Sequence, residues 1–225
     1  MTLLDYPEHV ACTVFLGGCD FRCPFCHNYD LACGEVPEAM SKEELFAFLD
    51  KRGGLLDGVA ITGGEPCVNS DLPDLIKEIR GRGFKVKLDT NGNHPGMLEA
   101  LLSEGLVDYV SMDIKNSPEK YAATCGVSAV DMRRIYDSIS VLAGSGISYE
   151  FRTTVVREFH ENSDFEKIGR MIEGAPVYYL QPFTDREQVT WRGLHTPTEK
   201  ELEEFAKTAK KRVPNTFLRG VDHTG

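Results

Sequence analysis

The sequence lacks any uninterrupted apolar stretch of about 18–20 residues, the length that a membrane-spanning helix requires. It is also poor in basic residues, with 25 against 35 acidic ones, and its formal net charge is −10. A surface of that sign repels polyanions, so neither nucleic acid nor an anionic membrane is an expected partner. The first residues show neither the basic nor the long apolar segment of a secretion signal, so we expect a cytoplasmic protein.

No linker, low-complexity tract or internal repeat divides the 225 residues. This length suits one compact domain, and 41% hydrophobic with 27% charged residues is an ordinary globular balance. We therefore predict a single folded domain that covers residues 1–225.

Short apolar segments rich in β-branched residues alternate with segments whose apolar residues recur at helical spacing. Capping residues at Ser41, Asp71, Ser128, Ser163 and Thr198 indicate where helices start. About six strand–helix units in succession predict an α/β fold with parallel strands and right-handed crossovers. The predicted strands are residues 10–16, 58–62, 84–88, 107–112, 147–156 and 177–182.

A closed barrel of eight strand–helix units typically takes about 250 residues, and this chain supplies about six units. An open partial barrel and a doubly wound sheet therefore both fit the sequence. In either fold, ligands gather at the carboxyl ends of the strands.

The cysteines carry the strongest chemical signal. A chain without a secretion signal is not expected to form disulfides, because the cytosol is reducing. Cys19, Cys23 and Cys26 have the spacing C-x3-C-x2-C on the loop after the first strand. Three thiolates there can hold three irons of a four-iron, four-sulfur cluster and leave the fourth iron open. A structural zinc site, completed by a fourth ligand, is the alternative, and the spacing alone does not decide which metal binds. The candidates for that fourth ligand are Cys12, His27 and Cys33.

Two further motifs end predicted strands. Gly63 and Gly64 let the backbone approach a ligand closely, and Glu65 can accept hydrogen bonds from an amine, although an ordinary turn is the simpler interpretation. Asp113 and Lys115 lie two residues apart on one face of a strand. They can address one ligand together or form a structural salt bridge.

The cysteine spacing resembles the signature of the radical S-adenosylmethionine (SAM) superfamily. Cys26-His27-Asn28, together with residues 2–7 and 14–19, is similar to one branch of it, the activating enzymes of glycyl-radical enzymes. Within that branch, the similarity is to the activating proteins of anaerobic ribonucleoside-triphosphate reductase, and it extends through Pro182. The resemblance implies a single-domain partial (β/α)6 TIM-like barrel with a [4Fe-4S] cluster on Cys19, Cys23 and Cys26. The activating enzymes of pyruvate formate-lyase tend to have a histidine near Thr184, which this chain lacks.

The resemblance also implies contacts to SAM at the ends of the strands. In the family, the segment equivalent to Gly63–Glu65 binds the amino group of SAM, and an arginine that Arg152 resembles contacts SAM. The expected SAM-binding residues are Phe25, His27, Gly63, Gly64, Glu65, Asp113, Ile114, Lys115, Arg152 and Gln181. Related enzymes are thought to hold Na+ or K+ against the SAM carboxylate. Carboxylates in such a site repel one another strongly, and Lys115 is the one cation foreseen there, so we expect this ion too. Its predicted ligands are Asp89, Thr90, Ser111 and Asp113.

These residues predict reductive cleavage of SAM to a 5′-deoxyadenosyl radical, which removes a hydrogen atom from its target. The favoured target is a backbone glycine of a glycyl-radical enzyme such as anaerobic ribonucleotide reductase, with a flavodoxin- or ferredoxin-type reductant. No general base is needed, in keeping with the lack of a Ser-His-Asp or Cys-His pattern. One alternative is an enzyme that modifies a peptide or a small heterocycle, such as a deazaguanine synthase. Another is a non-catalytic zinc or electron-transfer protein. Cys12, Cys33, Cys67 and Cys125 lack ligand spacing and are interpreted as small buried hydrophobes.

Overall fold

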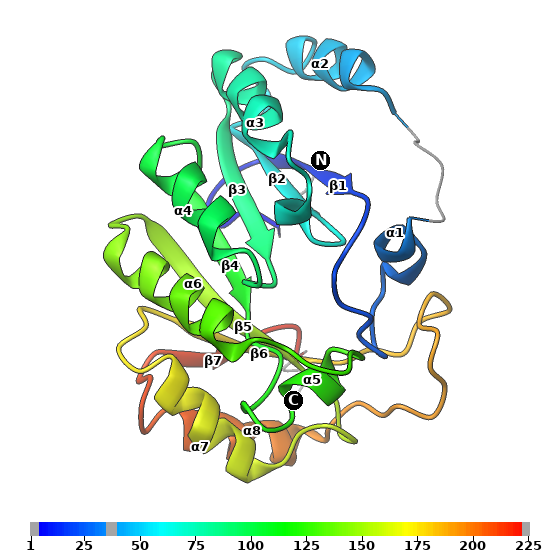
Figure 1. Ribbon diagram of the computed structural model, residues 1–225, viewed down its shortest axis with the longest axis vertical. Coiled ribbons are helices and arrows are strands. Elements are labelled where there is room, and N and C mark those ends of the chain that lie inside the picture. The colour runs from blue at the N-terminus through cyan, green and yellow to red at the C-terminus, as the bar shows by residue number, and fades with distance from the viewer. Residues whose placement is uncertain (1–4, 35–39, 222–225) are drawn as a thin grey trace.

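A computed structural model describes residues 5–34 and 40–221 of the chain. In this part, parallel strands form one sheet whose spatial order follows the chain from β1 to β7 (Figure 1). The strands are β1 (Ala11–Leu16), β2 (Gly58–Gly63), β3 (Lys85–Thr90), β4 (Tyr109–Asp113), β5 (Ser148–Val155), β6 (Tyr178–Pro182) and β7 (Thr216–Leu218). The architecture is the predicted α/β partial barrel, with its two edges at β1 and β7.

Helices connect the strands and cover one side of the curved sheet. In Figure 1, α3, α4, α6 and α7 lie along that side, whereas the loop after β1 and the short α1 lie on the other side. The longer helices are α2 (Lys42–Asp50), α3 (Leu72–Gly81), α4 (Pro95–Ser103), α6 (Met132–Gly144), α7 (Asn162–Met171) and α8 (Glu199–Ala209). The short ones are α1 (Tyr29–Cys33), α5 (Tyr121–Thr124) and the 3-10 helix η1 (Pro66–Val68). No helix among the described residues is both long and apolar enough to span a bilayer.

All six predicted strands are confirmed, with ends that move by one or two residues. The seventh, β7, was not predicted, because its three residues are too few to show a strand pattern. It lies at the edge of the sheet and pairs in parallel with β6, which places Thr216 beside Tyr178. Pairing with β6 therefore makes β7 a strand, although its local sequence does not indicate one.

The helix starts were predicted with mixed success. Ser41 and Thr198 form the expected capping boxes with Glu44 and Glu201. Asp71 precedes α3 but makes no capping hydrogen bond, because its carboxylate pairs with Lys42 of α2.

Two other helices begin away from the predicted position. The α6 helix begins after Asp131 rather than Ser128, since the Asp131 carboxylate accepts from the Arg133 amide. The cap of the α7 helix is Glu161, two residues before the predicted Ser163, because Glu161 and Asp164 form the reciprocal cap.

The two faces of the sheet differ in character. On β3, Val86 and Leu88 point toward the helices and are fully buried in the apolar core. Lys87 and Asp89 alternate with them, so these charged side chains point into the concave interior of the barrel. The same alternation on β4 and β5 places further polar residues on the concave face, which prepares the site described next.

Candidate functional site

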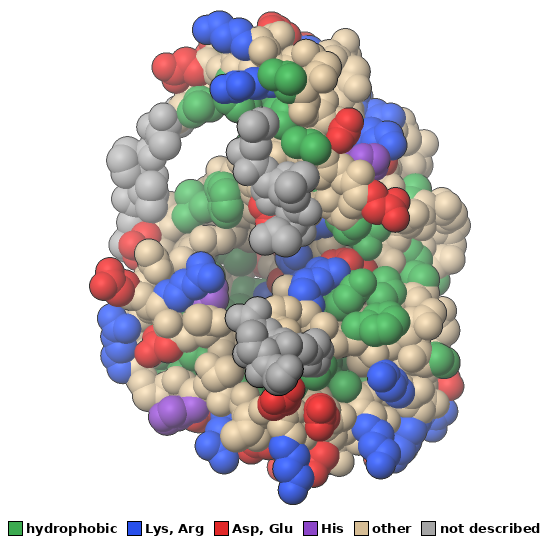
Figure 2. All heavy atoms as spheres, turned by 180° about the vertical axis from the view of Figure 1, so that it is seen from behind, with side chains coloured by type: hydrophobic (Ala, Val, Ile, Leu, Met, Phe, Trp, Pro, Cys, Tyr) green, Lys and Arg blue, Asp and Glu red, His purple; other side chains and the backbone are tan. Residues whose placement is uncertain are grey.

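A cavity of about 520 Å³ lies at the carboxyl ends of the strands. This volume is within the usual range of ligand pockets, roughly 300–1,000 Å³. Its lining includes Cys19, Cys23 and Cys26 together with residues from the ends of β2 to β6. Figure 2 shows one face of the molecule hollowed near its centre, with Lys and Arg side chains on either side of the hollow.

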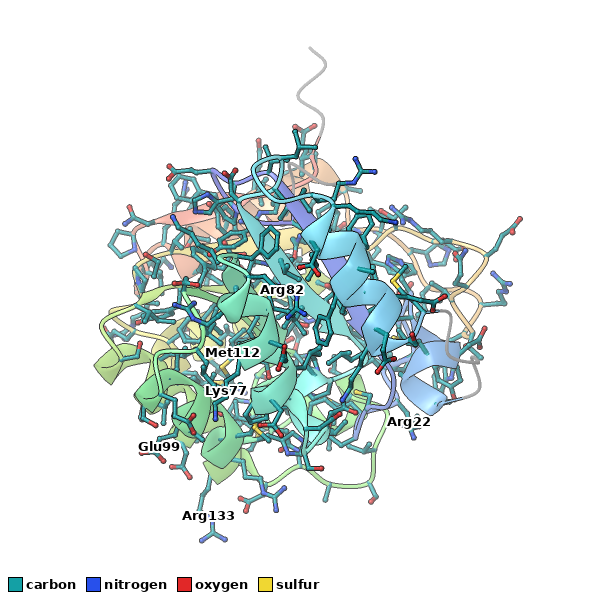
Figure 3. The ribbon with its side chains drawn as sticks, turned by 90° about the horizontal axis from the view of Figure 1, so that it is seen from above. Arg22, Lys77, Arg82, Glu99, Met112 and Arg133 are labelled. Carbon is teal, nitrogen blue, oxygen red and sulfur yellow. The ribbon has the colours of Figure 1, made fainter. Side chains whose placement is uncertain are left out.

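Backbone contacts hold the cysteine loop at this cavity. The Arg22 amide donates to the Cys125 carbonyl at 2.8 Å, and the Asn28 side chain donates to the Gly63 carbonyl at 3.0 Å. The Cys26 amide closes a turn on the Cys23 carbonyl at 3.1 Å. Figure 3 shows Arg22 beside α1, on the outside of this loop.

Gly63 and Gly64 permit a close approach, but between two segments of the chain itself. A Cβ on Gly64 would lie 2.0 Å from the Gly18 carbonyl oxygen, and a Cβ on Gly63 would lie 2.3 Å from that of Leu16. Gly63 also has a positive φ of 124°. The paired glycines therefore let the end of β2 pack directly on the start of the cysteine loop, while their backbone still lines the cavity.

The three cysteines suit a cluster better than a single ion. Within the described residues, no three His, Cys, Asp or Glu side chains converge closely enough to hold one metal ion. A mononuclear zinc site requires such convergence on one point. In a four-iron cluster each thiolate binds a different iron, so three sulfurs spread around one cavity fit that group. The described residues thus give no support to a mononuclear zinc site, and the three cysteines stay the predicted ligands of a [4Fe-4S] cluster.

The cysteine thiols differ in their electrostatics. A hydrogen bond from the Cys125 thiol is the main reason that the pKa of Cys23 falls to about 7, with help from Lys115. Burial raises the pKa of Cys19 to about 12, and Glu65 and Asp20 add to that shift. Cys12, Cys67 and Cys125 are buried as predicted, whereas Cys33 is partly exposed.

Glu65 makes several hydrogen bonds within the protein that the sequence did not indicate. Its side chain is fully buried, and it accepts hydrogen bonds from the Thr90 hydroxyl at 2.7 Å, the Cys67 amide at 3.0 Å and the Asn91 amide. Burial raises its pKa in spite of these donors. Because both carboxylate oxygens already accept from the protein, Glu65 joins the end of β2 to the end of β3. Glu65 also lines the cavity, and its contact with the amino group of SAM stays a prediction.

Asp89 and Asp113 are compensated by more cations than the sequence suggested. Arg152 of β5 donates to Asp113 and also to Asp89, the latter at 3.1 Å. Lys115 donates to Asp113 at 2.7 Å, and Lys87 pairs with Asp89. Burial alone would raise the pKa of Asp113, but Arg152 and Lys115 hold it well below its usual range. Arg152 is therefore a partly buried, paired residue rather than an exposed edge arginine.

These pairs correct the argument for a monovalent cation. That argument took Lys115 as the lone positive charge, whereas Arg152 and Lys87 also face the two aspartates. The Ser111 hydroxyl donates to Glu150 at 2.9 Å and the Thr90 hydroxyl donates to Glu65, whereas the expected ligands were the Ser111 carbonyl and the Thr90 hydroxyl or carbonyl. The cation stays a prediction for which the structure shows no electrostatic need.

Most of the other predicted SAM contacts gather at the cavity. The lining includes Phe25, His27, Asp113, Lys115, Arg152 and Gln181. His27 also bonds the Thr184 carbonyl at 2.7 Å, which ties the cysteine loop to the segment after β6. Ile114 and Ser111 are fully buried and do not line the cavity.

Two groups of site residues were missed. Arg219, just after β7, lines the cavity and donates to Glu150 at 2.7 and 2.8 Å. It was missed because β7 itself was not foreseen. Asp20 and His94 form a contact beside Cys19, and no spacing connects residues that lie 74 positions apart.

The chain matches the model of the Radical SAM superfamily over residues 13–172. A Methanocaldococcus jannaschii protein with the provisional name glycyl-radical enzyme activating enzyme is 31% identical over 230 residues, which cover 100% of this chain and 95% of that protein. The pyruvate formate-lyase-activating enzyme of Clostridium pasteurianum is 32% identical over 183 residues, 77% of this chain and 73% of that protein. The chain therefore belongs to the radical SAM superfamily. It is an enzyme of that class, which implies SAM and a [4Fe-4S] cluster as cofactors.

Other relatives and one solved structure widen the comparison. The GTP 3′,8-cyclase of Marinobacter nauticus is 27% identical over 209 residues, 88% of this chain and 61% of that protein. The 7-carboxy-7-deazaguanine synthase of Methanopyrus kandleri is 34% identical over 122 residues, 45% of this chain and 48% of that protein. Streptococcus suis SuiB bound to S-adenosylmethionine has a similar fold, with a TM-score of 0.73 at 14% identity. That likeness covers 95% of this chain and 51% of SuiB.

Proposed function

We propose that this enzyme installs a glycyl radical on a partner enzyme, such as an anaerobic ribonucleotide reductase. The observation that supports this most is the 31% identity to the M. jannaschii relative over essentially the full length of both chains. The matches to the cyclase and the deazaguanine synthase leave more of those proteins uncovered. We also place the enzyme in the cytoplasm, with a flavodoxin- or ferredoxin-type electron donor.

The residues of the cavity divide the work between them. Cys19, Cys23 and Cys26 would hold the cluster. When bound and reduced, such a cluster would supply the one electron that cleaves the S–C5′ bond of SAM, giving methionine and a 5′-deoxyadenosyl radical able to take a hydrogen atom from the target. The backbone of Gly63 and Gly64 would receive the amino group of SAM.

The concave face has an excess of positive charge that suits an anionic ligand. Its named cations outnumber its carboxylates, so the carboxylate of SAM would meet a favourable potential. Among the residues that line the cavity, the cations are Arg22, Lys115, Arg152, Arg186 and Arg219, and the carboxylates are Glu65, Asp89 and Asp113. Because of this excess of positive charge, our proposal does not require Na+ or K+ beside the SAM carboxylate. SAM binding in a buffer whose cation is bulky and organic tests this point.

The first experiment tests the cluster and its ligands. After anaerobic reconstitution we expect about four irons per chain, as a site-differentiated cluster requires. With dithionite as reductant, SAM should be cleaved to 5′-deoxyadenosine. Replacing Cys19, Cys23 or Cys26 by Ala should abolish cleavage, and Cys33→Ala serves as the matched control. Full cleavage by Cys23→Ala would refute the cluster assignment.

The second experiment tests the partner. The enzyme is reduced with SAM and mixed with each candidate glycyl-radical enzyme in turn, and electron paramagnetic resonance is recorded. A doublet glycyl signal that requires both proteins supports the proposal. SAM cleavage without such a signal for every candidate partner counts against it.

A second candidate function is radical chemistry on a small anionic heterocycle. The observation that favours it is that Arg186 and Arg219 also line the cavity, beyond the residues foreseen for SAM. Incubation with GTP and other purines under the same reducing conditions, followed by mass spectrometry, separates the two. Conversion of GTP without a protein partner would favour this candidate.

A further inference from the structure

A compact polar network lies beside Cys19. Asp20 accepts hydrogen bonds from the Asn91 side chain at 2.8 Å, from His94 at 3.1 Å and from the Asn93 side chain. An Asp20 carboxylate oxygen and the Asn91 side-chain nitrogen each lie 3.9 Å from the Cys19 sulfur. Neither the glycine turns nor the predicted SAM contacts account for this network.

Further contacts and partial burial hold this network in place. Asn91 is buried, and its side-chain oxygen accepts from the Asn93 amide at 2.8 Å, which fixes the side chain in a local turn. The Asn91 amide is itself anchored by Glu65. Asp20 and His94 are only about one quarter exposed, at 24% and 27% of their side chains.

The charges matter because a carboxylate opposes electron uptake next to it. Asp20 and Glu65 are the negative groups near the Cys19 thiol, and Lys115 is a more distant cation that favours the thiolate. Without compensation, Asp20 would make reduction of a cluster held by Cys19 harder. His94 faces Asp20 at 3.1 Å and can compensate its charge when protonated; the hydrogen bond to that carboxylate is the main cause that raises the pKa of His94. Hydrogen bonds and charges near the sulfurs are known determinants of cluster potentials.

We propose that Asp20 and His94 are a positioning pair that sets the reduction potential of the cluster through Cys19. Asp20 orients Asn91 toward the sulfur, and His94 cancels the charge that this carboxylate brings. The inference rests on the cluster of the proposed function. It adds two residues that act on electron uptake and do not line the cavity.

The test is a redox titration of the reconstituted protein, followed by electron paramagnetic resonance of the reduced cluster at neutral pH. His94→Gln keeps a hydrogen-bond donor but removes the charge, so its potential should fall. Asp20→Asn removes the carboxylate, so its potential should rise. We expect about a tenfold change in the reduced-to-oxidised ratio at fixed potential, which is 59 mV for one electron. The double variant should lie between the single ones, because both charges are gone.

The matched control is His195→Gln. His195 pairs with Glu158 at 2.6 Å in an exposed segment, so the same substitution removes a His–carboxylate pair away from the cysteines. Iron and sulfide content are measured for every variant. Two results would overturn this inference and leave the proposed function standing. One is a His94→Gln potential equal to that of the wild type, and the other is a shift of both single variants in the same direction. A wild-type protein without a four-iron signal would overturn the proposed function with it.

Discussion

The two faces of the sheet hold their charges in opposite ways. On the helical side, ion pairs are exposed, such as Lys77 with Glu104 at 50% and 49% side-chain exposure. Figure 3 shows Lys77 on α3, with Glu99 and Arg133 on neighbouring helices. On the concave side, Lys87 and Asp89 pair at 4% and 14% exposure. Exposed pairs are screened by water and contribute little, whereas removing one partner of a buried pair leaves an uncompensated charge.

This difference indicates that the concave face is organised for ligand binding at some cost in stability. Glu150 is nearly inaccessible, and it is satisfied by Arg219, the Tyr109 hydroxyl and the Ser111 hydroxyl. Apolar residues would fill this interior with less desolvation. A polar interior of this kind instead presents fixed charges to a ligand and leaves an opening at the carboxyl ends of the strands.

The largest effect is expected from Arg152→Met. Asp89 and Asp113 would each keep one lysine, so we expect a loss of about 3 kcal/mol, the lower end for breaking a buried pair. The matched change on the helical side is Arg170→Met, which removes an exposed pair with Glu166 and should cost about 0.3–0.5 kcal/mol. Anaerobic denaturant unfolding measures both. Equal losses would show that the two faces do not differ.

A smaller effect is expected where the cysteine loop meets β2. Gly64→Ala forces a Cβ against the Gly18 carbonyl, and we expect about 1–3 kcal/mol of destabilisation with poorer cluster incorporation. Gly96→Ala on α4 meets nothing within 4 Å and should be neutral or stabilise by up to about 1 kcal/mol. Thermal unfolding and iron content are the measurements. A Gly64→Ala protein with wild-type values for both would contradict the close packing.

Helix caps on the outer side should show a still smaller difference. Ser41→Ala removes a reciprocal cap on α2 and should cost about 1 kcal/mol. Asp71→Ala should cost less, because its side chain makes no capping hydrogen bond and its partner Lys42 is exposed. The ranking is checked by urea midpoints. An Asp71→Ala loss larger than that of Ser41→Ala would contradict it.

The smallest effect concerns pH. Because Asp20 raises the pKa of His94, this pair adds stability that is fully present below the unfolded pKa, about 6.5, and is lost as pH rises through the folded pKa. His94→Gln should therefore be less stable than the wild type at pH 6, with a smaller difference at higher pH. Unfolding free energies of both proteins across that range provide the check. A difference that grows with pH would reverse the assigned sign.

Much of the site could be predicted because its residues follow one another in the chain. The spacing of Cys19, Cys23 and Cys26 is local, and so is the placement of Gly63 and Asp113 at strand ends. Short apolar segments rich in β-branched residues likewise indicate where the strands lie, because they alternate with segments of helical spacing. Of residues 2–7, which resemble the activating enzymes, residues 2–4 lie outside the part of the chain that the structure describes.

The sequence by itself determined the parallel α/β order, and it predicted the cluster ligands and the end of the sheet where these cysteines lie. Tertiary structure decided the partners of the charged residues. Glu65 turned inward because Thr90 and Asn91 reach it from β3, and Arg152 joined Asp89 to Asp113 across three strands. Pattern and spacing act within one segment, whereas the pairing of buried charges depends on which segments the fold brings within hydrogen-bond distance.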